Sequence, residues 1–157
     1  MGLTVGPATW HPNNLGDTAL GSTVYGGRLF CKNGLGTAFI VAPASTQVAS
    51  VWNGALTGFV GNKPCVSDWP SLCTALINGG LTPSQWFVPS LAQLQSGYAC
   101  RTYWDSFTST YYWSSTECNS NYASDLGFGS GGDTSRAFKA TACGSIFPVR
   151  AFRCVTY

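Results

Sequence analysis

Two short strings, dense in aromatic and β-branched side chains, constrain this chain more than any other feature. Residues 111–117 read Tyr-Tyr-Trp-Ser-Ser-Thr-Glu, and residues 147–154 read Phe-Pro-Val-Arg-Ala-Phe-Arg-Cys. Such side chains favour β-strands, whereas the Gly-, Ser- and Asn-rich stretch between the strings cannot form a core of its own. We therefore expect the two strings to be paired central strands beneath a surface of displayed loops.

Two helices are predicted in the middle of the chain. The helical spacing of apolar residues after Trp69, with Pro70 in the first turn, predicts a helix that stops at Gly79. A second, short helix is expected over residues 90–96, because Ser90 and Gln93 form a capping box, and Gly97 is expected to end it.

Further strands are predicted on either side of these helices. Residues 28–31 and 37–43 flank an Asn-Gly pair, which accepts the positive φ of a tight turn and predicts a β-hairpin. Residues 122–128 and 136–140 are expected to form strands around a Gly-rich turn. The stretch 45–65 is expected to be irregular, with Trp52 and Phe59 pointing inward. Together these elements predict an α+β domain.

Length and composition narrow the class of protein. With 157 residues the chain has the size of one domain; we expect residues 1–25 to be an extended arm or a connection to a carrier, and residues 26–157 to be the folded domain. Eight scattered Lys and Arg and a net charge of +2 give no basic stripe for nucleic acid. No apolar run reaches the roughly 20 residues of a membrane span, and no secretory signal is recognised at the start.

Catalytic signatures are also missing from the sequence. His11 is the only histidine and lies in the expected arm, and no Ser-His-Asp set or phosphate-binding glycine motif is found. We therefore expect a protein that is not an enzyme.

The order of these motifs resembles the C-terminal domain of bacterial collagen-like adhesins. These C-type lectin-like domains also occur in bacterial surface proteins and phage tail fibres. The most specific parts of the resemblance, which covers about residues 21–155, are Trp-Ser-Ser-Thr-Glu at 113–117 and Val-Arg-Ala-Phe-Arg at 149–153. Where the family has Trp-Arg-Leu-Pro, this chain has Trp-Phe-Val-Pro at residues 86–89. Because the Arg is absent, the role that it has in the family is not expected in this chain. The resemblance implies a C-type lectin-like fold, an antiparallel sheet with two short helices and a long loop region that carries the ligand surface.

The resemblance also has implications for cysteines and assembly. In relatives that contain disulfides, one bond ties the first helix to the last strand and another ties loops of the central strands. Applied to the seven cysteines of this chain, the resemblance implies one disulfide between Cys73 and Cys154 and another between Cys118 and Cys143. The same resemblance implies a homo-oligomer, a trimer by analogy. Formylglycine-generating oxidases share the general fold, but their Arg-Gly-Gly-Ser-Trp type of signature is not found here.

Aromatic and short polar residues in the expected loops are the main functional hint. Flat rings cover the apolar face of a sugar, while amides and carboxylates bind its hydroxyl groups. Charged residues make up only 9% of the chain and aromatics 14%, which favours such recognition over charge-driven binding. The predicted ligand-binding residues are Tyr103, Trp104, Asp105, Asn119, Asn121, Tyr122, Asp133 and Arg136.

A calcium site is a weaker alternative to a cofactor-free domain. Five oxygen ligands gather in one half of the chain, namely Glu117, Asn119, Asn121, Asp125 and Asp133. The Glu-Pro-Asn and Trp-Asn-Asp signatures of calcium-dependent sugar binders are absent, so we expect no cofactor. Glu117, the only glutamate, is expected to pair with Arg150 or Arg153.

These observations favour a receptor-binding or adhesion domain of a virion or a cell surface. Its expected partners are a host cell-surface glycan or protein and a carrier or virion protein bound through the arm, with no nucleic acid and no membrane insertion. One alternative is a structural virion protein, a decoration or fibre-joining component, whose aromatics are buried between subunits. Another is a diversified ligand-binding protein that varies between residues 103 and 136.

Overall fold

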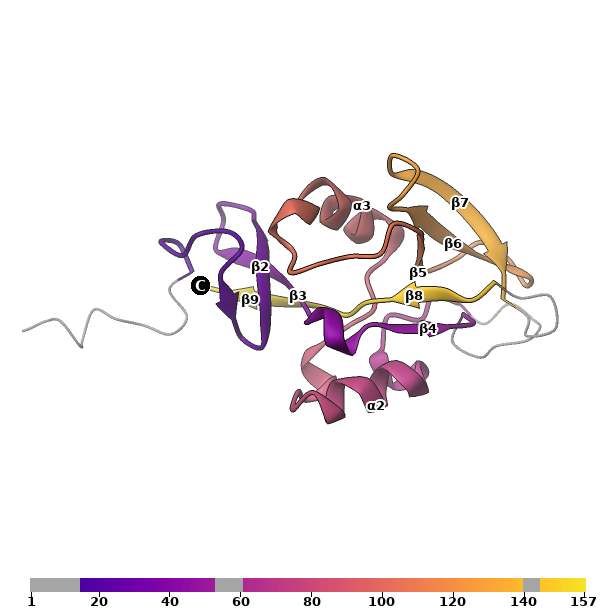
Figure 1. Ribbon diagram of the computed structural model, residues 1–157, viewed down its shortest axis with the longest axis horizontal. Helices are drawn as coiled ribbons and strands as arrows, with labels where there is room; N and C mark the ends of the chain where they lie inside the picture. The colour runs from indigo at the N-terminus through magenta and orange to yellow at the C-terminus, as the bar shows by residue number, and fades with distance from the viewer. Residues whose placement is uncertain (1–14, 53–60, 140–144) are drawn as a thin grey trace, which may run out of the picture.

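The computed structural model describes residues 15–52, 61–139 and 145–157 (Figure 1). Within this part of the chain, two α-helices pack against three antiparallel sheets, which confirms the predicted α+β class. The helices are α2 (Pro70–Asn78) and α3 (Leu91–Ala99), and the short 3-10 turns are η1 (Ala44–Thr46), η2 (Val66–Asp68), η3 (Pro83–Gln85) and η4 (Arg101–Tyr103). The strands are β1 (Thr23–Val24), β2 (Gly27–Lys32), β3 (Thr37–Val41), β4 (Val48–Ser50), β5 (Tyr111–Glu117), β6 (Tyr122–Gly127), β7 (Asp133–Phe138), β8 (Phe147–Val149) and β9 (Phe152–Thr156).

The first sheet contains the predicted hairpin. Its strand order is β1-β2-β3-β9, and β2 and β3 pair antiparallel around the Asn-Gly turn. Asn33 stabilises that turn, because its side-chain oxygen accepts the N–H groups of Leu35 and Thr37 at 2.8 and 3.0 Å. Gly34 has a φ of 73°, in the left-handed region that glycine adopts without strain.

The C-terminal run is not one strand, and its predicted pairing with residues 111–117 is wrong. β8 pairs with β4, whereas β9 pairs with β3, so the run leaves one sheet and enters another (Figure 1). β5 pairs with β6 instead. β8 contacts β5 only through side chains, with the ring of Phe147 4.9 Å from that of Trp113.

A buried arginine explains the break between β8 and β9. The guanidinium of Arg150 donates to the carbonyl oxygens of Ala42 and Ser106 at 2.7 and 2.6 Å and forms an ion pair with Asp105. A buried charge needs partners of this kind, and satisfying them turns residue 150 away from the strand direction.

Both helices lie where they were predicted, with one corrected boundary. Pro70 occupies the first turn of α2, and the reciprocal hydrogen bonds of Ser90 and Gln93 cap α3. Gly97 does not end α3, which continues to Ala99. This glycine is buried against Phe152 and Trp104 instead, where a Cβ atom would lie 2.6 and 3.1 Å from their rings.

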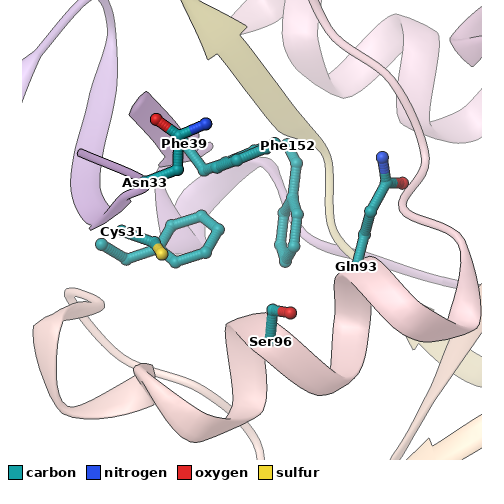
Figure 2. Close-up of a pocket in the computed structure, with 7 residues that line it drawn as sticks. Cys31, Asn33, Phe39, Gln93, Ser96 and Phe152 are labelled. Carbon is teal, nitrogen blue, oxygen red and sulfur yellow. The ribbon is translucent and has the colours of Figure 1, made fainter. Parts of the chain in front are cut away.

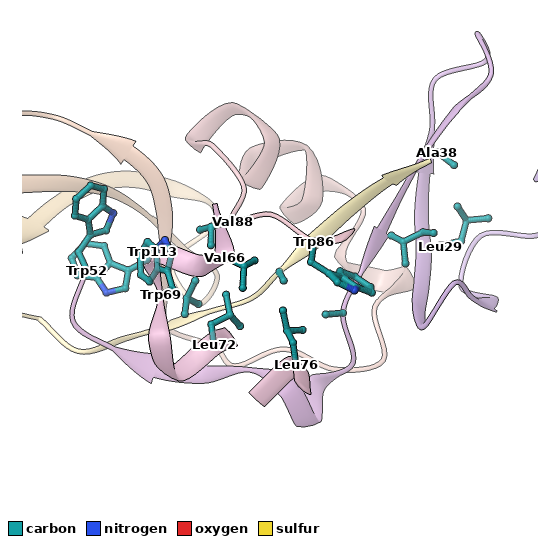
Figure 3. Packing of buried hydrophobic residues seen from close by; sticks show 14 of the residues in the cluster. Leu29, Ala38, Trp52, Val66, Trp69, Leu72, Leu76, Trp86, Val88 and Trp113 are labelled. Carbon is teal, nitrogen blue, oxygen red and sulfur yellow. The ribbon is translucent and has the colours of Figure 1, made fainter. Parts of the chain in front are cut away.

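Two groups of buried apolar side chains form the core. The larger group lies between α2 and the sheets and includes Trp52, as predicted, whose ring meets that of Trp69 edge to face at 5.9 Å (Figure 3). The smaller group, under α3, is mainly aromatic and contains Phe30, Trp104 and Phe152. Phe59 lies outside the described residues.

Part of the expected N-terminal arm belongs to the folded body. Residues 1–14 lie outside the described residues, but Leu15 is buried in the larger core group and β1 pairs with β2. Lys32 donates hydrogen bonds to the carbonyl oxygens of Leu15, Gly16 and Thr18. The body therefore starts no later than residue 15, and the boundary expected after residue 25 is too late.

Candidate functional site

Among the eight predicted ligand-binding residues, Tyr122 and Arg136 form a cation–π contact. The guanidinium carbon of Arg136 lies 5.2 Å from the ring centre of Tyr122, on one face of the β6–β7 hairpin. Phe138, which was not predicted as a site residue, stands directly opposite Tyr122, with 4.4 Å between the ring centres. We call Tyr122, Arg136 and Phe138 the aromatic–arginine ladder.

The ladder is open to solvent at Phe138 and Arg136, whereas Tyr122 is half-buried. Phe138 is 43% exposed although it is a large apolar side chain, and Arg136 is exposed as well. The other half of the same face is covered, because Leu126 is buried in the aromatic core group with Leu94 of α3. Between the covered and open halves lies a shallow hollow lined by Leu91, Cys118, Ser124, Thr134, Ser135 and Arg136.

Strand β7 adds an open edge to this surface. Among the described residues it pairs with β6 only, and nearly all of its residues are exposed (Figure 1). Rings, a cation, hydroxyl groups and free backbone groups therefore occur together at one border of the molecule. Flat rings with adjacent hydrogen-bonding groups are suited to sugars and to protein surfaces.

Trp104 is a correction, because its ring cannot take part in an exposed site. It is only 6% exposed and packs edge to face on Phe152 and Tyr112, at 5.6 and 6.4 Å between ring centres. Its segment has no regular periodicity, so the sequence did not distinguish an inward from an outward ring.

Asp105 lies at the surface, but its carboxylate is already bound to other parts of the chain. Its carboxylate binds Arg150 and accepts the backbone N–H of Ala44 at 2.8 Å. Burial acts to raise the pKa of Asp105, but the Ala44 hydrogen bond and the neighbouring guanidinium outweigh it and hold the pKa below its ordinary value. This carboxylate orders the loop before β5 and is not a free ligand group.

The remaining predicted residues are spread along the surface. Asn119 shapes the β5–β6 turn, where its side-chain oxygen accepts the N–H groups of Asn121 and Tyr122 at 2.8 and 3.0 Å. Asn121 is exposed beside the ladder, and its carbonyl oxygen accepts the N–H of Lys139. Asp133 lies at the other end of the hairpin, about 16 Å along the strand from Tyr122. Tyr103 is 40% exposed on η4.

The five calcium candidates do not form a metal site in the part of the chain that the structure describes. Glu117 pairs with Lys139, not with Arg150 or Arg153 as expected, and both side chains of the pair are completely buried. The Lys139 ammonium also lies 5.0 Å from the ring centre of Trp52. Asp125 is buried as well, on the face of β6 opposite to the ladder.

The implied disulfide between Cys73 and Cys154 is not formed, because both residues are free thiols. Cys73 lies on α2 and Cys154 on β9, where its side chain is exposed. Cys143 lies outside the described residues, so the implied pair with Cys118 is not described. The thiol of Cys118 lies 3.1 Å from the hydroxyl of Ser124.

A separate apolar pocket lies between α3 and the first sheet (Figure 2). It has a volume of about 250 Å³, with Phe39 and Phe152 on the sheet side and Gln93 and Ser96 on the helix side. Cys31 lies at its wall, near Cys100 at the end of α3. Burial, and to a smaller extent Cys31, raise the pKa of the Cys100 thiol, which lowers its reactivity.

Comparison with known proteins adds no relative, since no family model matches this chain and no curated protein is similar to it. In the described residues no helix has the length and apolar character needed to cross a membrane.

Proposed function

We propose that this chain is a non-enzymatic receptor-binding or adhesion domain with a C-type lectin-like fold, from a phage tail fibre or a bacterial surface protein. The ligand is a cell-surface glycan or protein. The observation that carries the proposal is the exposed aromatic–arginine ladder of Tyr122, Arg136 and Phe138. The motif order described above supports the fold and the setting.

The ladder has the composition of a binding hot spot. Aromatic and arginine side chains dominate the binding energy of protein interfaces, and rings stack on the apolar face of sugars. Holding Phe138 in water is unfavourable by roughly 25 cal/mol for each Å² of exposed apolar area. A ligand that covers the ring removes this cost.

The test is binding of the purified chain to host cells and to a glycan array. The double variant Tyr122→Ala with Phe138→Ala should weaken binding about tenfold or more, as truncated hot-spot residues do. Ile77→Ala on α2 is the matched control, because Ile77 is also an exposed apolar side chain, at 58%. Equal binding by both variants would contradict the ladder as the ligand surface.

A structural virion protein is the second candidate, favoured by the open edge of β7. An exposed strand edge and an exposed phenylalanine can both be covered by a neighbouring subunit. Light scattering distinguishes the two functions. Under the first, the double variant keeps the assembly state of the wild type and loses binding; under the second, the wild type is an oligomer, by analogy a trimer, and the double variant dissociates.

A further inference from the structure

The face of the β5–β6–β7 sheet opposite to the ladder contains a buried carboxyl group, one oxygen of which has no hydrogen-bond partner among the described residues. Asp125, in the middle of β6, is 1% exposed, and its Oδ1 atom has no partner among the described residues. Burial raises the pKa of this carboxyl group to about 6. At neutral pH the group is therefore mostly a carboxylate, and a buried carboxylate without a partner is destabilising.

Asp125 lines a pocket of about 220 Å³ that opens beside β8. Tyr111 and Phe147 form its aromatic walls, with 5.6 Å between their ring centres. Ser135 stands directly opposite Asp125 on β7 and adds a hydroxyl group, and Ala137 also lines the pocket. The pocket thus combines one anionic group, one hydroxyl group and two rings.

Among the described residues, no charged side chain forms an ion pair with Asp125. On β5, Glu117 is already paired with Lys139. On β7, Arg136 is among the residues that line the pocket, but its guanidinium lies over the ring of Tyr122. Asp133 carries the same sign of charge as Asp125. The three residues of β8, Phe147, Pro148 and Val149, contribute no charge.

We propose that this pocket binds a small organic cation, a primary ammonium group on a short chain, with the Asp125 carboxylate as its counterion. The ammonium group donates hydrogen bonds to Asp125 and Ser135, and its charge is attracted to the faces of Tyr111 and Phe147. A neutral hydroxyl group can occupy one hydrogen-bond position but leaves the buried charge uncompensated.

The size of the pocket limits the ligand to one such group. Pockets for drug-sized ligands have volumes of roughly 300–1,000 Å³, so 220 Å³ fits an aminoalkyl group or the amino end of a larger molecule. This site lies on the opposite face from the ladder and does not depend on the function proposed for that surface.

The experiment compares two probes of equal size, ethanolamine and ethylene glycol, by NMR on the full chain. Ethanolamine should shift the carboxyl carbon of Asp125 and the backbone signals of Tyr111, Ser135 and Phe147, with a Kd of about 10 mM or tighter. Ethylene glycol should not. Because the ammonium group requires the ionised carboxyl group, ethanolamine binding should weaken about tenfold from about pH 7 to about pH 5.

Two variants locate the site. Asp125→Asn should abolish ethanolamine binding while circular dichroism remains that of the folded chain, and Asp133→Asn should retain it. The proposal is overturned if ethanolamine produces no shifts, if ethylene glycol binds as tightly, or if affinity does not fall at low pH. The comparison of probes and the pH series use the unaltered chain, so they test the proposal even if Asp125→Asn fails to fold.

Discussion

At the scale of single residues, Asp125 makes the stability of this protein depend on pH in an unusual direction. Burial raises its pKa to about 6 from an ordinary value of 3.8, so between these values the folded state holds a proton that the unfolded state has released. Protonated Asp125 therefore stabilises the folded state fully at a pH below its pKa in the unfolded chain. This stabilisation is lost as the pH rises through about 6. The loss is on the order of 3 kcal/mol, because each pKa unit corresponds to about 1.4 kcal/mol.

We therefore predict that Asp125→Asn removes this pH dependence. From about pH 4 to pH 7, the free energy of unfolding of the unaltered chain should fall, whereas that of the variant should not show this fall. At neutral pH the variant should therefore be the more stable of the two. Urea titrations of both proteins across this range give the difference directly. Asp133→Asn, which changes an exposed carboxyl group, should follow the unaltered chain. Parallel curves for Asp125→Asn and the unaltered chain would contradict the prediction.

The structure brings some of the predicted site residues together and separates others. Tyr122 and Arg136 were predicted as site residues and do lie together, because the Gly-rich turn between β6 and β7 brings them to the same end of a hairpin. Phe138 follows from the same hairpin once its register is known. Trp104 and Asp105 contact Phe152 and Arg150, which are distant in the sequence, so no local pattern identified these contacts.

At the scale of elements, α3 is positioned by a close contact that only glycine allows. Gly97 is buried, and a Cβ atom at this position would lie 2.6 Å from Cζ of Phe152, a ring that is itself completely buried. Real Cβ contacts are not this short, so the ring or the helix has to move. The contact explains why α3 passes through a glycine that the sequence pattern suggested as its end.

We predict that Gly97→Ala destabilises the fold by about 1–2 kcal/mol. The higher helix propensity of alanine contributes up to about 1 kcal/mol in its favour, but overpacking a tight core typically costs 1–3 kcal/mol. Urea unfolding measures the net effect. Ser96→Ala, on the exposed side of the same helix, should change stability by less than about 0.5 kcal/mol. A stabilised Gly97→Ala variant would mean that Phe152 moves easily.

Elements with local signals were predicted from the sequence, and those set by distant contacts were not. The Asn-Gly turn, Pro70 and the Ser90 capping box are complete within a few residues, so the hairpin and both helix starts were correct. The division of residues 147–156 between two sheets depends on carbonyl groups at Ala42 and Ser106. No pattern within the run itself identifies those partners.

At the scale of the whole molecule, Arg150 connects three parts of the fold. Its guanidinium reaches the end of β3 at Ala42, the loop at Asp105 and Ser106, and the ring of Trp104, 5.3 Å from the guanidinium carbon. Arg150 therefore joins the first sheet to the aromatic core group under α3. Desolvation acts to lower the pKa of Arg150 and outweighs the opposing effect of Asp105.

We predict that Arg150→Met destabilises the protein by about 3 kcal/mol or more, because the buried Ala42 carbonyl, the Ser106 carbonyl and the Asp105 carboxylate lose their donor. Arg153→Met is the matched control. Arg153 is half-buried on β9 and donates to the carbonyl oxygen of Tyr25, so its loss should cost about 1 kcal/mol. Urea unfolding of both variants checks the difference, and similar values for the two would show that Arg150 is not a central connection.

The division of the C-terminal run between two sheets also has a consequence for synthesis. β4 pairs with β8, and β3 pairs with β9, so neither pair can form before residues 147–156 have left the ribosome. During that interval the exposed edges of β3 and β4 belong to an incomplete fold, the kind of species that aggregates most readily. β3 and β4 therefore complete their pairing only after β8 and β9 have been synthesised, and the yield of folded protein in cells should be sensitive to chaperones that cover nascent strands.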